Sequence, residues 1–412
     1  MSAKQIRLLF IILLLPISIS FFEARFLPKS LVNYSNFLFC GIAFVVSLPF
    51  MFIRKRGFVF PIQLIVLAMV ISLFMAQISW GQSISNSIKS TVPVSLWIFF
   101  FFLLKYKVEV KKLEWIIVGY GLIYIFLYYY QYRHSPNVIF GGEEEYTDQD
   151  RGILRILFPG GGIFILMAFM ALNKFTSGFR PKWLWLGLAI SGLVITVLQV
   201  TRQAIFAVFI LYLFHLLRDL NIFKKAIVLI AFAAAVWIIK DSRNPIIQGI
   251  MEAQTRDNQE GRKNNIRYVA ATYFLNDFAP NKGSQWLGNG VPYALSSGYA
   301  ILLERLADMY GFYLADVGLV GFYVMFGVLA VLAYVLIWVK SVIIPLPKDY
   351  YYVRYYLWYL LITSLTSNTV FHPNFLLTTV FALYIYQTVA IEEKPSYSKE
   401  PEFKLKKEPV FA

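Results

Sequence analysis

Long apolar segments, separated by short polar ones, run along almost the whole of this chain. A helix needs about 20 predominantly apolar residues to cross the hydrocarbon of a bilayer, and runs of that kind recur throughout. The segments predicted to span the membrane are 6–22, 31–53, 58–78, 86–104, 114–132, 153–173, 183–200, 203–217, 225–239, 312–339, 353–370 and 374–391. This pattern predicts an all-α, polytopic membrane protein with about twelve transmembrane helices.

Two places in this pattern are irregular. Segments 183–200 and 203–217 are separated only by Thr201-Arg202, so the second segment is expected to be short, tilted or partly re-entrant. Segment 312–339 is longer than one crossing requires, and we expect it to begin outside the hydrocarbon.

The charged residues assign a side to each predicted span. Only 15% of the residues are charged and 58% are hydrophobic, whereas a soluble domain has roughly 25% charged residues. Lysine and arginine concentrate in alternate short loops, which face the cytoplasm by the positive-inside rule. These basic ends are 4–7, 54–56, 105–112, 174–182, 218–225, 340–354 and the C-terminal tail. Both termini are therefore predicted to be cytoplasmic, and the net charge of +15 is assigned to the membrane surface, with no nucleic acid as a partner.

Two longer segments are predicted on the opposite, external side. Residues 133–152 are acidic, and residues 240–310 form a large external loop between the ninth and tenth predicted helices. Structureless loops of that length are uncommon, so we expect ordered structure within it. Apolar residues recur at helical spacing within 264–278, which predicts a small helical cap over the external face.

The chain divides into a membrane domain and a tail. Residues 1–391 form a single polytopic membrane domain, which includes the external loop 240–310, and residues 392–412 form a basic cytoplasmic tail. The tail is rich in lysine and interrupted by proline, which favours a disordered segment that lies on anionic lipid. The first apolar segment lacks a small-residue cleavage site and is followed by Glu23-Ala24-Arg25, so we interpret it as a retained helix.

Arg202 is the foremost candidate for a functional residue, because it falls between two predicted spans with almost no loop around it. An arginine at membrane depth is costly, and its guanidinium matches phosphate oxygens in a bidentate manner. It could therefore clamp a lipid-linked phosphate, or it could reach the lipid headgroups as an ordinary anchor. Further cations in the large loop either form a solvated helix face or converge with Arg202 on a diphosphate. They are Arg256, Arg262, Lys263 and Arg267.

Three glycine-containing segments could shape a site. Residues 288–290 read Gly-Asn-Gly, a pattern that can be no more than a turn. Residues 316–321 place Asp316 before two glycines near the external end of an apolar run, and a carboxylate at membrane depth is a functional hypothesis by default. Residues 159–162, Pro-Gly-Gly-Gly, interrupt segment 153–173 and indicate either a simple kink or a broken helix lining a cavity.

The sequence offers no motif for a cofactor or a metal. Motifs of nucleotide-binding loops, zinc proteases and serine hydrolases are missing. Cys40 is the only cysteine, and His134, His215 and His372 lie in separate segments. We therefore predict chemistry that needs no cofactor and no metal.

In their order along the chain, these elements resemble the O-antigen polymerase and O-antigen ligase superfamily of bacterial membrane glycosyltransferases. A Thr-Arg pair opens a middle helix at 201–202, and a Gly-Arg pair follows in the large loop at 261–262. Gly-x-Gly stands at 288–290, and an acidic-x-Gly-x-x-Gly signature closes the series at 316–321. The resemblance covers most of the chain as topology and implies a location in the bacterial plasma (inner) membrane.

One departure from the family pattern bears on the reaction. Ligases of the family carry a His-Asn pair just before the last signature, whereas residues 307–310 here read Ala-Asp-Met-Tyr. A histidine base is therefore lacking at that place, and the resemblance favours a polymerase with a carboxylate as base or with catalysis by positioning alone. The candidate residues are Asp308, Glu304 and Asp316 for catalysis, and Arg202, Arg262 and Arg267 for binding the diphosphate.

The resemblance implies a substrate as well as a fold. The expected reaction joins undecaprenyl-diphosphate-linked oligosaccharide repeat units into a surface polysaccharide (O-antigen, capsule or exopolysaccharide) on the outer face of the membrane. Membrane lipid and a chain-length regulator are the other expected partners. Two alternatives stay open, a ligase that transfers finished glycan to another acceptor, and a transporter or flippase of lipid-linked sugars. A transporter should carry cations along a cavity through both leaflets, and here the mid-membrane segments are nearly free of charge.

Overall fold

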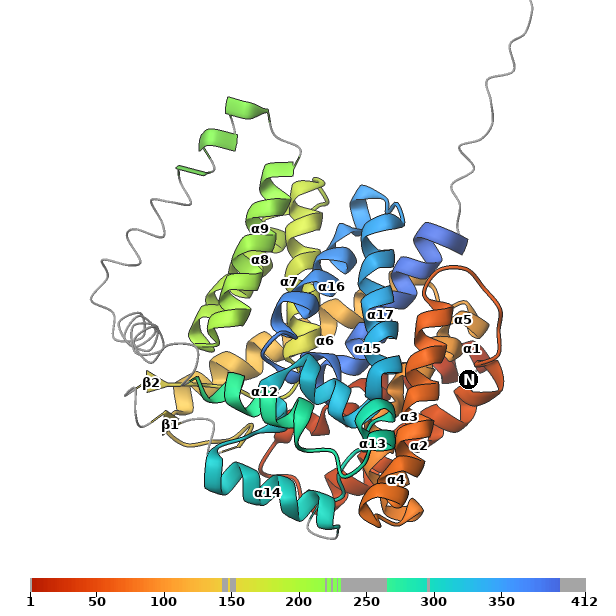
Figure 1. Cartoon of the computed structure of the whole chain (residues 1–412). Helices are drawn as coiled ribbons and strands as arrows, with labels where there is room; N and C mark the ends of the chain where they lie inside the picture. The colour runs from red at the N-terminus through yellow and green to blue at the C-terminus, as the bar shows by residue number, and fades with distance from the viewer. Residues whose placement is uncertain are drawn as a thin grey trace, which may run out of the picture.

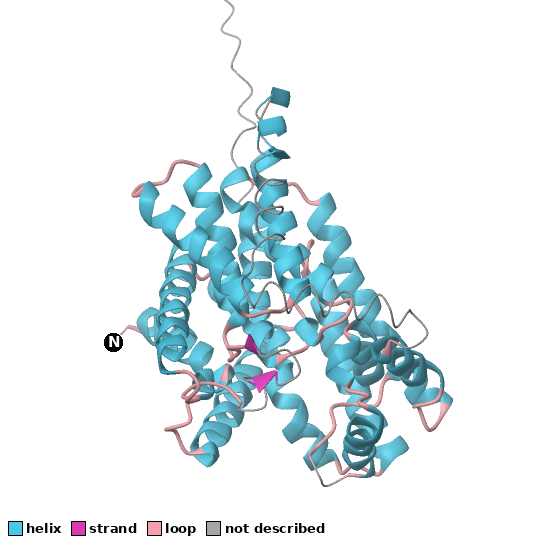
Figure 2. Cartoon of the chain, turned by 90° about the vertical axis from the view of Figure 1, so that its left-hand side faces the viewer, coloured by secondary structure: helices cyan, strands magenta, loops and turns pink. Residues whose placement is uncertain are grey.

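The computed structural model describes residues 2–142, 147–148, 153–218, 221–223, 225–227, 229–230, 265–294 and 297–392. The regular elements among these residues are helices and very short β pairings, chiefly β1 (Thr147–Asp148) with β2 (Ile153–Leu154), and loops connect them, as Figure 2 shows. The first half contains α1 (Ala3–Ser18), η1 (Ser20–Glu23), α2 (Lys29–Ser47), η2 (Leu48–Phe50), α3 (Val59–Trp80), α4 (Ile84–Thr91), η3 (Val92–Ile98), α5 (Phe99–Tyr106), α6 (Val110–His134), α7 (Gly161–Thr176), α8 (Lys182–Leu198) and α9 (Arg202–Arg218). The second half contains α12 (Ile266–Asn276), α13 (Lys282–Leu287), α14 (Gly298–Tyr310), η5 (Leu314–Val317), α15 (Leu319–Ile343), η6 (Lys348–Tyr350), α16 (Tyr351–Thr363), η7 (Asn368–Val370), α17 (Pro373–Gln387) and η8 (Thr388–Glu392).

Several helical segments have the length and composition of membrane spans. Among the described residues these are Lys29–Phe50, Val59–Trp80, Ile84–Tyr106, Leu319–Ile343 and Pro373–Glu392, and α7 and α8 are shorter apolar helices. The composition is that of a helical membrane protein, which agrees with the predicted fold class. The number of about twelve spans stays a prediction, and most of the predicted span 225–239 lies outside the described residues.

The helix ends refine the predicted spans. α7 begins at Gly161, so Pro159 and Gly160 precede the helix and the two following glycines start it, and the predicted kink or break inside a helix is wrong. The reason is local, because Pro159 has no N–H to donate and Gly160 adopts a φ of 109°, which is foreign to an α-helix. α15 begins at Leu319 after the separate turn η5, in line with the expected late start of segment 312–339.

α7 forms the centre of the bundle. Every residue from Gly162 to Lys174 is buried, as expected for a helix that is apolar on all sides. The helix packs against α6, α8, α16 and α17. Its contact with α8 is close, because a Cβ atom on Gly192 would come within 2.5 Å of Ala168. The Tyr212 hydroxyl of α9 adds a hydrogen bond to the Ala168 carbonyl at 3.2 Å, which ties the third helix to this pair.

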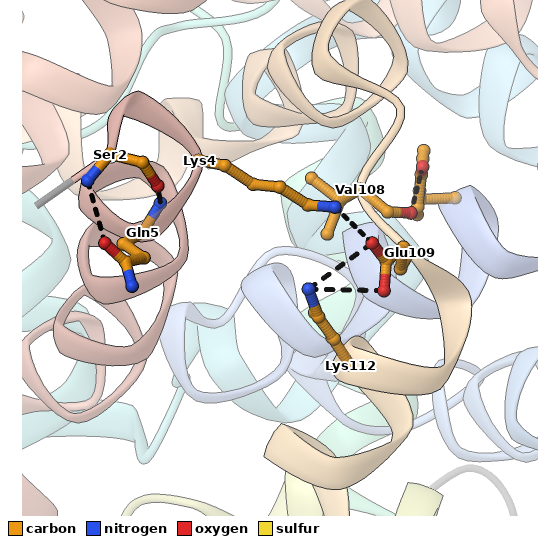
Figure 3. A network of polar contacts seen from close by, with 7 residues as sticks. Ser2, Lys4, Gln5, Val108, Glu109 and Lys112 are labelled. Carbon is orange, nitrogen blue, oxygen red and sulfur yellow. Dashed lines mark hydrogen bonds and ion pairs between the residues drawn. The ribbon is translucent and has the colours of Figure 1, made fainter.

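Charged residues from distant parts of the chain meet at one end of the molecule. Lys4 of α1 forms an ion pair with Glu109, which also pairs with Lys112 at 3.2 Å, as Figure 3 shows. Lys55 pairs with Glu392 at 2.7 Å, and Glu109 and Glu392 line one surface cavity. The structure thus places several of the predicted basic ends on one side of the bundle. Their assignment to the cytoplasm stays a prediction.

The large loop forms a small helical layer, α12 to α14, which lies in the lower part of Figure 1, below the lower ends of α8 and α9. α12 falls within the predicted segment 264–278. Its buried residues Ala270 and Phe274 share a core with Tyr299 of α14 and Val324 of α15. This layer therefore packs directly on α15, a helix with the length and composition of a membrane span.

A break in α15 fastens this layer to the bundle. Gly327 interrupts the helix with φ 76° and ψ −177°, a conformation that is open essentially to glycine alone. Beside the break, the N–H groups of Asn289 and Gly290 donate to the carbonyls of Val324 and Met325 at 2.9 and 2.8 Å. Carbonyl groups at membrane depth need partners inside the protein. The Gly-Asn-Gly segment supplies them, and thereby docks the cap.

Candidate functional site

A turn of left-handed helix joins α1 to α2. Ser20, Phe21, Phe22 and Glu23 have φ values of 54°, 52°, 60° and 51°. A left-handed conformation costs roughly 1–2 kcal/mol per non-glycine residue, and such strain persists only where the surrounding structure enforces it. Strained backbone of this kind collects at active sites and ligand clamps. The turn therefore marks this end of the molecule as a candidate site.

Contacts with the segment before β1 hold the turn in place. Segment 139–141 pairs with it through two main-chain hydrogen bonds, one accepted by the Glu23 carbonyl at 3.2 Å and one donated by the Arg25 N–H at 2.9 Å. The Phe22 ring is buried against Phe158, with 6.4 Å between the ring centroids. These contacts fix the position of the Glu23 backbone. They also enforce the positive φ values of the turn, which its residue types do not favour.

The corner between α8 and α9 is the second strained element. Val200, a β-branched residue, has a φ of 56°. Arg155 spans the corner, since its Nε donates to the Gln199 carbonyl at 3.3 Å and its Nη2 donates to the Thr201 hydroxyl at 3.1 Å. The Gln199 side chain in turn donates to the Tyr124 hydroxyl at 2.8 Å. Arg155 is thus bound to the turn that ends directly before Arg202, the first residue of α9.

A cavity of about 270 Å³ lies between the left-handed turn, this corner and the start of α17. Its polar lining among the described residues comprises Glu23, Tyr124, Gln199, Thr201, Gln203, Tyr359, Thr363, Ser367, Asn368, Thr369, His372 and Asn374. The Gln203 Oε1 atom is buried and has no hydrogen-bond partner within the described part of the chain. Buried polar atoms are usually satisfied, so this oxygen is suited to accept a hydrogen bond from a ligand hydroxyl.

A second cavity, of about 690 Å³, adjoins the left-handed turn. Glu23, Arg25, Lys29 and Asn33 supply its charged and amide side chains. The volume falls within the roughly 300–1,000 Å³ that is usual for ligand pockets. Both cavities have Glu23 in their lining.

The one carboxylate and the one imidazole that line the smaller cavity, Glu23 and His372, have shifted pKa values. Loss of hydration raises the pKa of Glu23, and the positive charge of Lys29 opposes this effect. Burial lowers the pKa of His372 to about 4, so its imidazole is neutral near pH 7. The His372 Nδ1 accepts a hydrogen bond from the Asn374 N–H at 3.3 Å and caps α17.

The predicted arginines lie in different environments. Arg202 begins α9 and is half-buried, and the residues on either side of it, Thr201 and Gln203, line the smaller cavity. Arg267 is exposed on α12, which packs on α15 and η5. Arg262 lies outside the described residues, as do Arg256 and Lys263. Convergence of these cations with Arg202 on a diphosphate therefore stays a prediction.

Two of the predicted carboxylates belong to the helical layer α12 to α14, and the third follows that layer in η5. Glu304 and Asp308 are exposed on α14. Asp316 is half-buried in η5, and η5 contacts η7, which contributes Asn368 and Thr369 to the smaller cavity. Asp316 thus belongs to an element that contacts η7, but its side chain does not line the cavity. Their catalytic roles stay predictions.

The glycines of the last signature have a packing role. A Cβ atom on Gly318, where φ is 54°, would lie 2.0 Å from the Ser364 carbonyl oxygen, and one on Gly321 would lie 2.4 Å from that of Leu314. Both positions therefore exclude a side chain, because main chain from η5 and from the end of α16 passes against them. The signature keeps η5, and Asp316 with it, close to η7.

Reasoning from the sequence missed Glu23, Arg155 and the position of His372. Glu23 was visible only as a charged residue after an apolar segment, and Arg155 falls inside the predicted span 153–173. An arginine at apparent membrane depth was a usable signal for Arg155. The fold alone could bring His372 from the last predicted loop to the same cavity.

Searches against protein-family models, curated proteins and solved structures find no match to this chain. The resemblance to the O-antigen polymerase and ligase superfamily therefore rests on the order of its motifs. The function of the site therefore has to follow from the chemistry of its own residues.

Proposed function

We propose that the protein is a bacterial membrane glycosyltransferase that polymerises undecaprenyl-diphosphate-linked oligosaccharide repeat units on the outer face of the plasma membrane. One observation carries the proposal. A polar cavity lies beside the strained α8–α9 corner, to which Arg155 is hydrogen-bonded and after which Arg202 begins α9. This corner is at the end of the bundle opposite the clustered basic ends. Guanidinium groups bind phosphate oxygens in a bidentate manner, and the cavity offers hydroxyl and amide groups suited to sugar.

The reaction requires charge stabilisation more than any other contribution. A hydroxyl of the acceptor sugar attacks the anomeric carbon of the donor, and the lipid diphosphate leaves with the bonding electron pair. Negative charge develops on the leaving oxygen, and fixed positive groups aimed at that place lower the barrier. Arg155 and Arg202 are suited to this role. The resemblance to O-antigen polymerases points to the same substrate.

The external layer offers a reason for repeat-unit specificity. η5 contacts η7 at the smaller cavity, and η5 also contacts α12. A glycan that leaves the cavity in that direction meets the layer formed by α12 to α14, whose aromatic side chains include the exposed Tyr268 and Tyr310. Aromatic faces suit sugar rings.

The test is the lipid-linked glycan profile of the source organism lacking this chain, complemented with wild type, Arg202→Ala or Arg133→Ala. Arg133 is an exposed arginine at the end of α6 and serves as the matched control. We expect the deletion to leave single repeat units, and wild type and Arg133→Ala to restore a ladder. Arg202→Ala should insert at the wild-type level and restore no ladder.

Other outcomes identify the alternatives. Accumulation of full-length lipid-linked chains in the deletion strain would replace the polymerase by a ligase that transfers finished glycan to another acceptor. Repeat units that stay on the cytoplasmic face would indicate a flippase. A glycan profile unchanged by the deletion would refute the proposal.

A further inference from the structure

Glu23 has a position shared by no other residue in the described part of the chain, because it belongs to the lining of both cavities at this end. The smaller cavity contains Thr201 and adjoins the corner with Arg155 and Arg202. The larger cavity contains Arg25 and Lys29. A carboxylate therefore stands where two polar cavities, each with cations beside it, come together.

The backbone holds this carboxylate at a cost. Glu23 ends the left-handed turn, and none of its four residues is a glycine. An ordinary turn would connect α1 to α2 without this strain. Strain that the surrounding contacts enforce is a reason to look for function in the residue it positions. Here that residue is the one acidic side chain of the turn.

We propose that Glu23 is the general base of the glycosyl transfer, with the donor sugar diphosphate in the smaller cavity and the acceptor sugar in the larger one. This inference rests on the proposed function. Arg155 and Arg202 would bind the diphosphate of the donor. Arg25 and Lys29 would bind an anionic group of the acceptor, because the acceptor of a polymerase is also linked to a lipid diphosphate.

The proposed step balances. The Glu23 carboxylate takes the proton of the acceptor hydroxyl while the hydroxyl oxygen forms a bond to the anomeric carbon. The bond from that carbon to the diphosphate oxygen breaks, and its electron pair leaves with the lipid diphosphate. Glu23 then gives its proton to water or to the released diphosphate, and the carboxylate is restored. The step needs no other reactant.

The protonation behaviour of the neighbouring groups favours Glu23 over His372. A general base works best when its pKa is near the working pH, and desolvation raises the pKa of Glu23 towards that range. The pKa of His372 is lowered to about 4, which makes the imidazole a weak base. Its Nδ1 is also occupied in capping α17.

The experiment compares Glu23→Gln with Glu109→Gln in the deletion strain and in membrane vesicles that contain its own lipid-linked repeat units. Glu109 is a carboxylate at the opposite end, paired with Lys4 and Lys112. We expect Glu23→Gln to lower the initial rate of ladder extension by about 10²-fold or more, the usual contribution of a general base. Glu109→Gln should extend the ladder at the wild-type rate.

A second measurement separates catalysis from folding. The other charged or titratable groups that line a cavity with Glu23 are Arg25 on the same stretch of chain and Lys29 of α2 in the larger one, and Tyr124, Tyr359 and the neutral His372 in the smaller one. Arg155 and Arg202 belong to the α8–α9 corner beside the smaller cavity. The rate should fall as pH decreases through the pKa of Glu23, because the base must be ionised. Lys29→Ala removes a charge that lowers this pKa, so the acid limb of the rate profile should move to higher pH. A merely structural role for Glu23 predicts no such movement.

The failures of the two proposals differ. If wild type restores the ladder and Glu23→Gln restores it equally, or if the acid limb stays in place in Lys29→Ala, Glu23 is not the base and the polymerase proposal stands. Loss of the ladder in Asp308→Asn together with its retention in Glu23→Gln would move the base to α14. If wild type itself fails to restore a ladder, the proposed function is what has failed.

Discussion

Gln131 shows how one buried side chain can organise the main chain of a site. It is completely buried in α6, and its Oε1 accepts hydrogen bonds from the N–H groups of Ile139 and Phe140 at 2.8 and 3.1 Å. Its Nε2 donates to the Asn137 carbonyl at 2.8 Å. The segment that it holds is the one that pairs with the left-handed turn. Gln131 therefore supports Glu23 at a distance.

Replacing this glutamine should destabilise the protein. Gln131→Leu keeps the approximate volume but leaves two N–H groups and a carbonyl without their partner, and each such group costs about 1–3 kcal/mol when buried. We expect a lower Tm of the detergent-solubilised protein, corresponding to a loss of about 3 kcal/mol or more. Gln285→Leu, which removes one long hydrogen bond at the surface, is the control and should leave Tm almost unchanged. Equal Tm values for the two variants would contradict this role.

Replacing Arg155 by lysine tests whether the site needs the hydrogen-bonding geometry of the guanidinium or only its positive charge. Its planar guanidinium reaches two acceptors across the α8–α9 corner, whereas a lysine would keep the charge and reach one of them. We expect Arg155→Lys to lower the rate of ladder extension about tenfold, which corresponds to losing one charge-assisted hydrogen bond of about 1.5 kcal/mol. The same exchange at the exposed Arg133 should have no effect. A wild-type rate for Arg155→Lys would show that the corner needs only the charge.

At the scale of elements, the sequence predicts helices better than it predicts their interruptions. The cap helix was predictable because apolar residues recur at helical spacing between 264 and 278, and α12 lies there. The break of α15 was not, since Gly327 stands in an apolar run like any other small residue. Its conformation is imposed by the Gly-Asn-Gly segment that approaches it. The left-handed turn with Glu23 is hidden for the same reason, because tertiary contacts select it against local preference.

The break in α15 predicts a large difference between two glycine substitutions. A Cβ atom on Gly327 would lie 2.4 Å from the Trp286 carbonyl oxygen, and φ there is 76°, so Gly327→Ala should cost roughly 2–5 kcal/mol through strain and overpacking. Gly119 lies inside α6, where a Cβ atom would meet nothing within 4 Å, and Gly119→Ala should stabilise by about 0.5–1 kcal/mol. Tm values in detergent that move in opposite directions would confirm the docking role of Gly327. Similar Tm values would refute it.

At the scale of the whole molecule, the two ends differ in the kind of charge they carry. One end contains ion pairs that connect α1 with the α5–α6 connection and the segment after η2 with η8. The other end contains the strained turns, both cavities and the helical layer of the large loop. Charge counting along the sequence separated these ends, because short loops alternate between them. It could not show which residues of the second end come together, since they derive from the first, sixth, seventh, eighth and last predicted spans or the loops beside them.

The assignment of the two ends to the two sides of the membrane can be tested with cysteine labelling. Lys107 is exposed at the end with the ion pairs, and Lys282 is exposed at the start of α13 in the external layer. The native Cys40 is buried, so it contributes little background. In intact cells a membrane-impermeant maleimide should label Lys282→Cys and leave Lys107→Cys unlabelled, and permeabilisation should make Lys107→Cys reactive. The reverse pattern would place the cavities on the cytoplasmic side, where nucleotide sugars are available, and a lipid-diphosphate donor would lose its rationale.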